Sequence, residues 1–357
     1  ALRGLCGLQS PGRERRLPPV TRTACQPRAF LVLLGLVLAC CRGSGEPPSG
    51  EQPGGPYLRC APPVDDGVKE RFRLEPLTLE RNGHDLDVRG IDRGTVVLGL
   101  LAGLHEPHPQ TLANLGFFLD RFRAAGVQLI SVAGGVGLQE QEVGGVLEAL
   151  AQAPVPVLVS PGAQESLDVL RAGIEKARRR FPQLVDMTRV RRVRIGHVTL
   201  ISLPGYHNAF YLEAGGRGCA YEEGDLSDVA LLAESGRANV LLSASPPRGS
   251  GTRAVDRGRG GVNIGDPALA RMLGEARIGF GLFGHVYESG GHATAADGAT
   301  AVAAGVWHDS LFVQAGAADA LPLDLVDGGH AAGMAHIIEI SSNRARYRVI
   351  FADPPSP

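Results

Sequence analysis

The chain has 357 residues, 44% of them hydrophobic, and a formal net charge of −1. This length and composition exclude a mainly disordered chain and allow one large folded domain or two modest ones. Residues 1–39 contain six arginines and one acid, Glu14, so the remainder from Cys40 onward is acidic with a charge of −6. We therefore expect no nucleic-acid partner.

The N-terminal segment has the pattern of an export signal. Arg28 precedes about ten apolar residues that end at Ala39, fewer than the ~20 that a membrane-spanning helix needs. Val37 to Cys40 resemble a bacterial lipobox, in which the cysteine is diacylated and the chain is cut before it. We interpret residues 1–39 as a signal peptide, with the first ~20 as a misplaced start, and Cys40 as the lipidation site. An ordinary secretory signal that is cut nearby is the alternative.

Residues 40–57 comprise the lipidated cysteine and a tether rich in proline and glycine, and residues 58–357 form the folded domain. This order predicts an exported lipoprotein, anchored at the periplasmic face or in the outer membrane. In an oxidising compartment Cys60 and Cys219 are a candidate disulfide. Two independent buried thiols are the alternative.

From Thr95 onward, short apolar runs alternate with segments of helical periodicity, which indicates a layered α/β domain. The helix expected over 166–181 ends in three arginines, 178–180, which we interpret as a solvated last turn. Further along the chain, some predicted strands follow one another without a helix between them. Together with the earlier alternation, this predicts two β-sheets packed face to face, with helices outside. The expected elements are strand 95–101, helix 109–125, strand 128–133, helix 139–151, strand 155–159, helix 166–181, strands 190–195 and 197–203, helix 226–234, strand 239–242, helix 267–275, and strands 278–283, 334–340 and 345–351.

Five blocks follow predicted strands: VVLGLLAGLHE (96–106), LISVAGGVG (129–137), VLVSPGAQES (157–166), VLLSASPP (240–247) and GFGLFGHVYE (279–288). Their order, followed by LFVQAGA (311–317), resembles the signature of the calcineurin-like metallophosphoesterases over residues 95–351. The resemblance implies a four-layer α/β/β/α sandwich. It also implies a site in which two metals bind a phosphoryl group and activate water.

The resemblance holds for the frame of each block but for only two of the seven metal ligands, His105 and His285. The replaced ligand positions are Gly103, Gly135, Ala163, Ala244 and Tyr287. Each metal would keep one protein ligand, and the bridging carboxylate that offsets the charge of two dications is lost. We therefore expect no cofactor. An active form would need a divalent transition metal, Mn, Fe or Zn.

Gln164 stands at the position of the family's proton-donating histidine, and glutamine cannot relay a proton at neutral pH. Glu165 either is a remnant of the catalytic pair or caps the helix that starts at Ser166. Other polar residues expected around the same mouth are Glu106, His108, Tyr206, His207, Tyr287, Glu288 and His292. A rebuilt mononuclear site of His105, His285 and Glu106 is one interpretation. We prefer remnants in a neutral pocket, because Glu106 points away from His105 on an extended segment.

Residues 246–261 contain Arg248, Arg253, Arg257 and Arg259, with glycines and prolines at both ends. The segment is either a mobile anion-binding lid, since guanidinium groups suit phosphate and polysaccharide acids, or a flexible solvated loop, which we prefer.

The leading prediction is a non-catalytic domain that acts in binding or in envelope structure. Its expected partners are the membrane, through the lipid anchor, and an unknown envelope protein or anionic polymer. The alternative is a divergent metal-dependent phosphoester hydrolase with a remodelled or mononuclear site.

Overall fold

A computed structural model describes residues 57–62, 65–91 and 94–356. The chain divides into two units, Ala1–Gly50 and Glu51–Pro357, and the described residues all belong to the second. The predictions for the signal peptide, for Cys40 and for the tether up to residue 56 lie outside the described residues. Within the described residues, no helix combines the length and the apolar character needed to cross a membrane.

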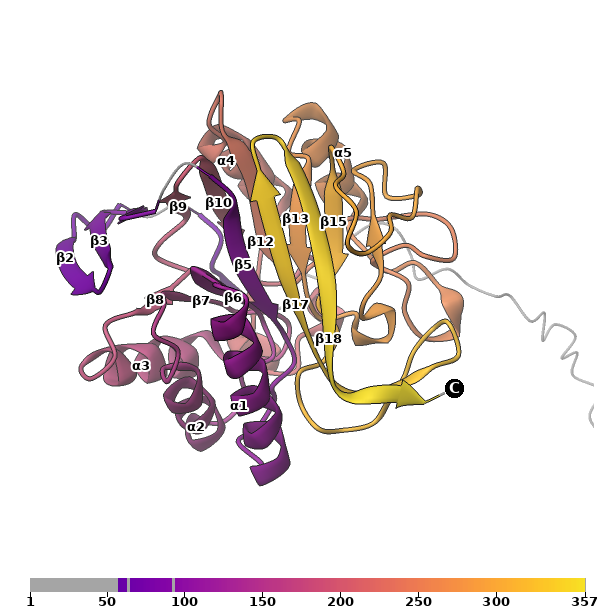
Figure 1. Cartoon of the computed structure of the whole chain (residues 1–357), viewed down its shortest axis with the longest axis horizontal. Coiled ribbons are helices and arrows are strands. Elements are labelled where there is room, and N and C mark those ends of the chain that lie inside the picture. Colours follow the sequence, from indigo (N-terminus) through magenta and orange to yellow (C-terminus); the bar gives the residue numbers. More distant parts are fainter. Residues whose placement is uncertain (1–56, 63–64, 92–93, 357) are drawn as a thin grey trace, which may run out of the picture. The chain divides into compact units, whose positions relative to one another are not determined.

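Two large sheets form the body of the domain (Figure 1). The nine-stranded sheet has the order β14 (Ala293–Thr294), β15 (Leu311–Gln314), β13 (Phe280–Phe283), β12 (Ala238–Ser243), β10 (Val198–Leu203), β9 (Arg192–Ile195), β4 (Asp85–Arg89), β3 (Leu77–Asn82) and β2 (Lys69–Leu74). The seven-stranded sheet contains β16 (Leu323–Asp324), β17 (His330–Ser341), β5 (Val96–Leu101), β6 (Leu129–Ala133), β7 (Val157–Ser160) and β8 (Leu184–Asp186), with β18 (Arg344–Ser356) paired to β17.

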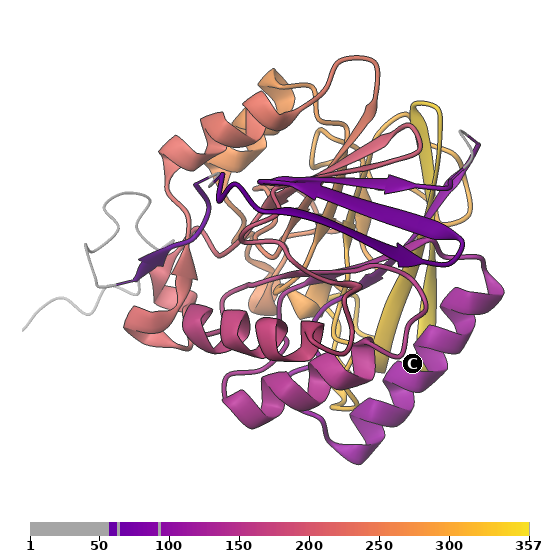
Figure 2. The ribbon, with the colours of Figure 1, turned by 90° about the vertical axis from the view of Figure 1, so that its left-hand side faces the viewer.

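Five α-helices among the described residues cover the outer faces of the two sheets. They are α1 (Pro109–Ala124), α2 (Glu140–Leu150), α3 (Leu167–Arg178), α4 (Glu223–Leu232) and α5 (Pro267–Glu275). Figure 2 shows α1–α3 on one side of the sheets and α4 and α5 on the other. The parallel strands β5 to β8 need crossover connections, and α1, α2 and α3 supply them.

The buried residues show why the layers take this order. One cluster lies between the sheets and contains Leu98 and Leu158 of the seven-stranded sheet together with Leu200 and Val240 of the nine-stranded sheet. A second cluster joins the other face of the seven-stranded sheet to α1, α2 and α3, and a third joins the nine-stranded sheet to α4 and α5. Strands buried on both faces explain the continuous apolar runs in the sequence. The predicted α/β/β/α order is confirmed.

The ends of the helices follow local sequence signals. Pro267 occupies the first turn of α5, and the Asp266 side chain accepts a hydrogen bond from the Ala268 backbone N–H. In α2, Gln139 and Glu142 form a reciprocal capping box. Each α-helix that the periodicity predicts is therefore present, with ends that shift by a few residues.

The prediction began the sheets at Thr95 and missed the antiparallel strands β2, β3 and β4, which extend the nine-stranded sheet. In β2 the residues alternate between exposed and half-buried, so charged side chains occupy most positions and no apolar run is present. The alternation of a strand with one solvated face was the signal that could have found them.

The start of the described chain is tied to the middle of the domain. Strand β1 (Leu58–Arg59) pairs with β11 (Cys219–Ala220), and Cys60 and Cys219 form a disulfide with their Cα atoms 5.7 Å apart. The two cysteines are 159 residues apart in the sequence. The first described residues therefore lie beside the loop at Gly205, whose backbone approaches both cysteines closely.

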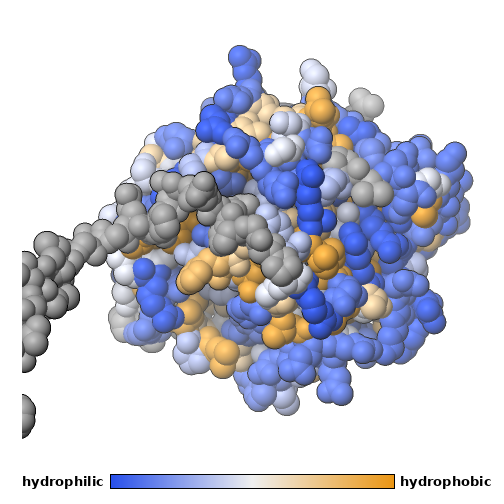
Figure 3. Space-filling view, turned by 180° about the vertical axis from the view of Figure 1, so that it is seen from behind, coloured by the Kyte–Doolittle hydropathy of each residue, from blue (hydrophilic) through white to orange (hydrophobic). Residues whose placement is uncertain are grey.

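The surface is mixed in character. Seen from behind, hydrophobic residues form small patches among hydrophilic ones (Figure 3). The exposed large hydrophobic side chains come from distant parts of the described sequence: Leu58, Leu112, Phe210, Leu231, Val262, Val306 and Leu321.

Candidate functional site

The loops at the carboxyl ends of the parallel strands meet, as the block order predicts. The backbone N–H of Gly103 after β5 donates to the Gly134 carbonyl after β6, and the Gly284 N–H after β13 donates to the Ser243 carbonyl of β12. The two sheets also meet here, because a Cβ added to Gly162 would lie 2.8 Å from the Cβ of Ala244. All five blocks therefore belong to one site.

The centre of this site is filled by protein. A Cβ added to Gly103 would lie 2.8 Å from Cε1 of Tyr287, the first residue of the short 3-10 helix η4 (Tyr287–Ser289). A Cβ added to Gly135 would lie 2.5 Å from Cα and N of Gly103, and 2.7 Å from the Tyr287 hydroxyl oxygen. Both glycines also have positive φ, 60° and 77°, which disfavours other residues. The loops pack backbone against backbone, with the phenol of Tyr287 over them.

The residues present do not fit the two-metal centre that the sequence resemblance implies. An aspartate at position 103 or 135 would need the space that Tyr287 and the Gly103 backbone occupy. Across the part of the chain that the structure describes, no three His, Cys, Asp or Glu side chains are grouped so that they could hold a metal ion.

His105 is held by an aspartate that the sequence reasoning missed. Its Nδ1 lies 2.6 Å from Oδ2 of Asp319, and its ring contacts Tyr287 edge to face, with centroids 5.2 Å apart. Burial by itself lowers the pKa of His105, but the hydrogen bond to Asp319 and nearby carboxylates outweigh it, so the pKa is raised. The loop after β15 that carries Asp319 donates two backbone N–H groups to the Gly103 carbonyl.

His105 and Glu106 do not lie on the extended segment that the sequence prediction assumed. His105 has a φ of 54°, and the Glu106 N–H closes a tight turn to the Leu104 carbonyl. Glu106 is exposed, and His105 turns toward Asp319. The prediction that His105 and Glu106 lie on an extended segment is therefore wrong.

His285 lies in an aromatic cluster of Tyr206, Tyr211 and Tyr287, with ring centroids 4.2, 5.8 and 6.2 Å from its own. Burial lowers its pKa to about 4, and the neighbouring His207 and His105 contribute to the decrease. The imidazole is therefore neutral at physiological pH. The two retained histidines both contact Tyr287, which occupies the last ligand position of the family pattern.

Glu165 does not cap helix α3; the N-cap residue is Ser166. The Glu165 side chain is fully buried, and its two oxygens accept from the backbone N–H of Val136 (2.6 Å) and of Gly162 (2.7 Å). Burial raises its pKa, and these hydrogen bonds oppose the rise. The carboxylate thus joins the loops after β6 and β7. The adjacent Gln164 has a buried Oε1 without a partner among the described residues.

His207 and Ser245 form a second polar contact that the sequence reasoning did not pair. The Ser245 Oγ is 2.6 Å from Nδ1 of His207, and Ser245 is fully buried. Burial lowers the pKa of His207 to about 4. The signal was available, since Ser245 follows Ala244, the replaced ligand position of the fourth block.

The remaining residues that were expected at the mouth have other roles. The His108 side chain accepts the Gln110 N–H at the start of α1. Glu288 lies 3.7 Å from Arg259, and His292 is buried with Nε2 4.0 Å from Asp327. None of these contacts reaches the Tyr287 centre.

The arginine segment 246–261 is held by contacts within itself and with the residues around it. Arg248 donates to the Gly265 carbonyl, Arg257 donates to the Gly251 carbonyl, and Arg259 pairs with Glu288. Arg253 is exposed. The segment is anchored by Asp256, which is fully buried and accepts from the Gly265 N–H and the Asn263 side chain. Anion binding by this segment stays a prediction.

The comparisons with known proteins bear on the fold. No family model matches the chain, and no curated protein matches it. A crystal structure that is 12% identical is similar with a TM-score of 0.53, over 72% of this chain and all of that chain.

Named solved structures are similar at lower TM-scores. The protein TT1561 of Thermus thermophilus is 12% identical, with a TM-score of 0.47 over 72% of this chain and all of its own. A dimetal phosphatase from Danio rerio is 12% identical, with a TM-score of 0.41 over 73% of this chain and all of its own. The predicted fold class, mixed α/β with two sheets flanked by helices, is confirmed by the arrangement of the strands and helices.

Proposed function

We propose that the chain is a surface-tethered lipoprotein whose metallophosphoesterase-like domain is non-catalytic and acts in binding or in envelope structure. The observation that carries the proposal is the closed centre of the site, where Gly103, Gly135 and Tyr287 are in direct contact. Two metals and a phosphoryl group need an open space lined by carboxylates and imidazoles. In this domain the same place holds glycine backbone and a phenol.

The proton chemistry supports the same conclusion. Gln164 replaces the histidine that donates a proton in the family, and an amide does not titrate near neutral pH. Both carboxylate oxygens of Glu165 already accept hydrogen bonds from backbone N–H groups. Its present contacts are structural, because they hold two loops together.

The tethered arrangement rests on the sequence of the first 57 residues. A basic residue, an apolar run ending in Ala39 and Cys40, and a segment rich in proline and glycine stand in the order found in lipoproteins. Mass spectrometry of the mature protein would test this part separately. An N-terminal diacylated Cys40 is the expected result, and an unmodified N-terminus at another residue would refute the lipid anchor.

The test of the non-catalytic assignment uses the chain from Tyr57 to its end. We expect no stoichiometric transition metal, and no hydrolysis of p-nitrophenyl phosphate or bis(p-nitrophenyl) phosphate with added Mn²⁺. Bound metal with turnover that His105→Ala abolishes would overturn the assignment. His330→Ala is the matched control, because His330 forms the same 2.6 Å contact to an aspartate, Asp324, but is exposed.

A mononuclear hydrolase is the second candidate, and one observation favours it. Metal-binding histidines commonly donate their other ring nitrogen to a carboxylate, as His105 could donate to Asp319. His105 would then be a ligand oriented for a single metal ion. The same metal analysis distinguishes the two candidates, since stoichiometric metal that is lost in both His105→Ala and Asp319→Ala supports the hydrolase.

A further inference from the structure

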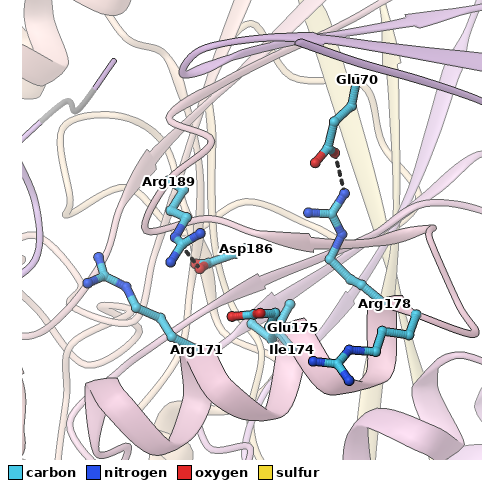
Figure 4. A pocket seen from close by; sticks show the side chains of 8 residues that line it. Glu70, Arg171, Ile174, Glu175, Arg178, Asp186 and Arg189 are labelled. Carbon is cyan, nitrogen blue, oxygen red and sulfur yellow. Dashed lines mark hydrogen bonds and ion pairs between the residues drawn. The ribbon is translucent and has the colours of Figure 1, made fainter. Parts of the chain in front are cut away.

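A charged cleft, none of whose lining residues belongs to the five blocks, lies between helix α3, strand β2 and the carboxyl end of β8 (Figure 4). Its volume is about 330 Å³. The lining residues are Glu70, Arg171, Ile174, Glu175, Arg178, Arg179, Asp186 and Arg189. Four guanidinium groups and three carboxylates thus line one open cleft, whose volume is at the lower end of the range for small-molecule sites.

Two of the arginines are fixed by partners. The Arg178 side chain bonds Glu70 across the cleft, and Arg189 lies 3.7 Å from Asp186, as Figure 4 shows. Asp186 also accepts from the backbone N–H and the hydroxyl of Thr188, at 2.9 and 2.7 Å. The walls of the cleft are therefore positioned by hydrogen bonds from three separate elements.

Donors remain after these pairs are formed. The Nε of Arg171 donates a hydrogen bond to the Thr188 hydroxyl, at 2.8 Å. Glu175, which also lines the cleft, forms no ion pair with Arg171 or with any other described residue. Arg179 is exposed at the edge of the cleft, and the buried Nε of Arg178 has no hydrogen-bond partner in the described part of the chain. The lining carries a net positive charge. Guanidinium donors and one carboxylate acceptor, Glu175, remain available to a ligand.

The sequence interpretation of 178–180 as a solvated last turn is correct only in part. Arg180 lies over the ring of Phe181, with its guanidinium carbon 5.1 Å from the ring centroid. Arg179 and Arg180 are exposed, as predicted, whereas Arg178 is half-buried and pairs with Glu70 across the cleft. The antiparallel strand β2, which the sequence analysis missed, supplies the opposite wall through Glu70.

We propose that this cleft binds an anionic sugar unit, that is, a hydroxylated ring that carries one phosphate or carboxylate group. The Nη groups of Arg171 and the guanidinium group of Arg189 suit the oxyanion, since a guanidinium group can donate two parallel hydrogen bonds, and Arg178, which is paired with Glu70, adds positive charge. Glu175 accepts hydrogen bonds from ring hydroxyls, which explains why a carboxylate lies among the arginines. The cavity has room for one sugar ring beyond the oxyanion.

This site is independent of the strand-end centre, so it does not depend on whether that centre is catalytic. It supplies a chemical class for the anionic polymer that was expected as a partner. A polymer built from charged sugar units would present many copies of the ligand to a domain held near its surface.

The test is isothermal titration calorimetry of the full chain, solubilised in detergent. The ligands are glucose 6-phosphate, glucuronic acid, glucose and inorganic phosphate, each titrated separately. We expect saturable binding of at least one of the two anionic sugars, and at least tenfold weaker binding of glucose and of inorganic phosphate. Which anionic sugar binds more tightly identifies the oxyanion. Binding should weaken as sodium chloride rises from about 0.05 M to about 0.5 M, because the contact is between charges.

Variants locate the site. Arg171→Gln should weaken binding of the anionic sugar about tenfold, or about 1.4 kcal/mol, and Arg189→Gln should act in the same direction. Arg271→Gln is the matched control, because it removes one exposed arginine that pairs with Glu223 on the opposite helix layer. Absence of saturable binding by both anionic sugars, equal affinity for inorganic phosphate, or equal weakening by Arg271→Gln would overturn the proposal. Thermal unfolding of each variant verifies that it is folded.

Discussion

Replacing Gly135 by alanine tests directly whether the centre of the site is closed. The new Cβ would lie 2.5 Å from Cα and N of Gly103 and 2.7 Å from the Tyr287 hydroxyl oxygen. Two of these three atoms belong to backbone and cannot rotate away. A left-handed conformation at φ 77° costs about 1–2 kcal/mol for a residue with a Cβ, and overpacking costs about 1–3 kcal/mol more. We expect the free energy of unfolding to fall by about 2–5 kcal/mol.

Gly126→Ala separates the two costs. Gly126 has a similar φ of 69°, but a Cβ there would meet no atom within 4 Å. It should therefore show only the backbone cost of about 1–2 kcal/mol. Urea unfolding at constant pH measures the free energy of unfolding of both variants. Equal slopes of that free energy against urea concentration would show that their denatured states are similar. Equal destabilisation by the two substitutions would refute the closed centre and reopen the question of a metal site.

Three further predictions concern the contacts around this centre. Because burial holds the pKa of His285 near 4, below its unfolded value, stability should fall as the pH drops from about 6.5 toward 4, by up to about 1.4 kcal/mol per pH unit for this residue. His285→Gln should reduce that slope, with a similar contribution left from His207, and an unchanged slope would contradict this. Replacing Cys60 and Cys219 by serine should cost about 2–5 kcal/mol because the bond closes a long loop, and the loss should match that of the reduced parent chain in urea unfolding. Glu165→Ala leaves two buried N–H groups without an acceptor and should cost about 2–5 kcal/mol, with faster amide exchange in the loops after β6 and β7 as the measurement; exchange that stays slow would show that other acceptors replace the carboxylate.

Periodicity predicted the α-helices and the buried strands well, because each of these elements buries a continuous stripe or a whole strand, but it predicted only part of the long strands β17 and β18. Helix α5 has the predicted bounds, and the buried strands β6 and β10 begin within one residue of prediction. The strands β2 to β4 were missed, since charged residues dominate their exposed faces. A strand with one solvated face gives a weak signal where the polar residues outnumber the apolar ones.

For the site, the order of the blocks predicted which loops meet, but not what their side chains touch. Asp319 is 214 residues from His105, and no local pattern links them. The position of Glu165 beside Ser166 suggested a cap, whereas its buried carboxylate turns to the neighbouring loop. Contacts of this kind depend on which strands lie side by side in the sheet. The sequence of one segment does not give that arrangement.

The contact between Gly103 and Gly135 also limits which side chains these two loops can accept. Any single aspartate introduced at either position would meet Tyr287 or the opposite backbone before it could meet a metal ion. A carboxylate at either position would require the phenol of Tyr287 to move away and the two loops to separate. A substitution in one loop alone therefore carries a stability cost, so Gly103, Gly135 and Tyr287 constrain one another.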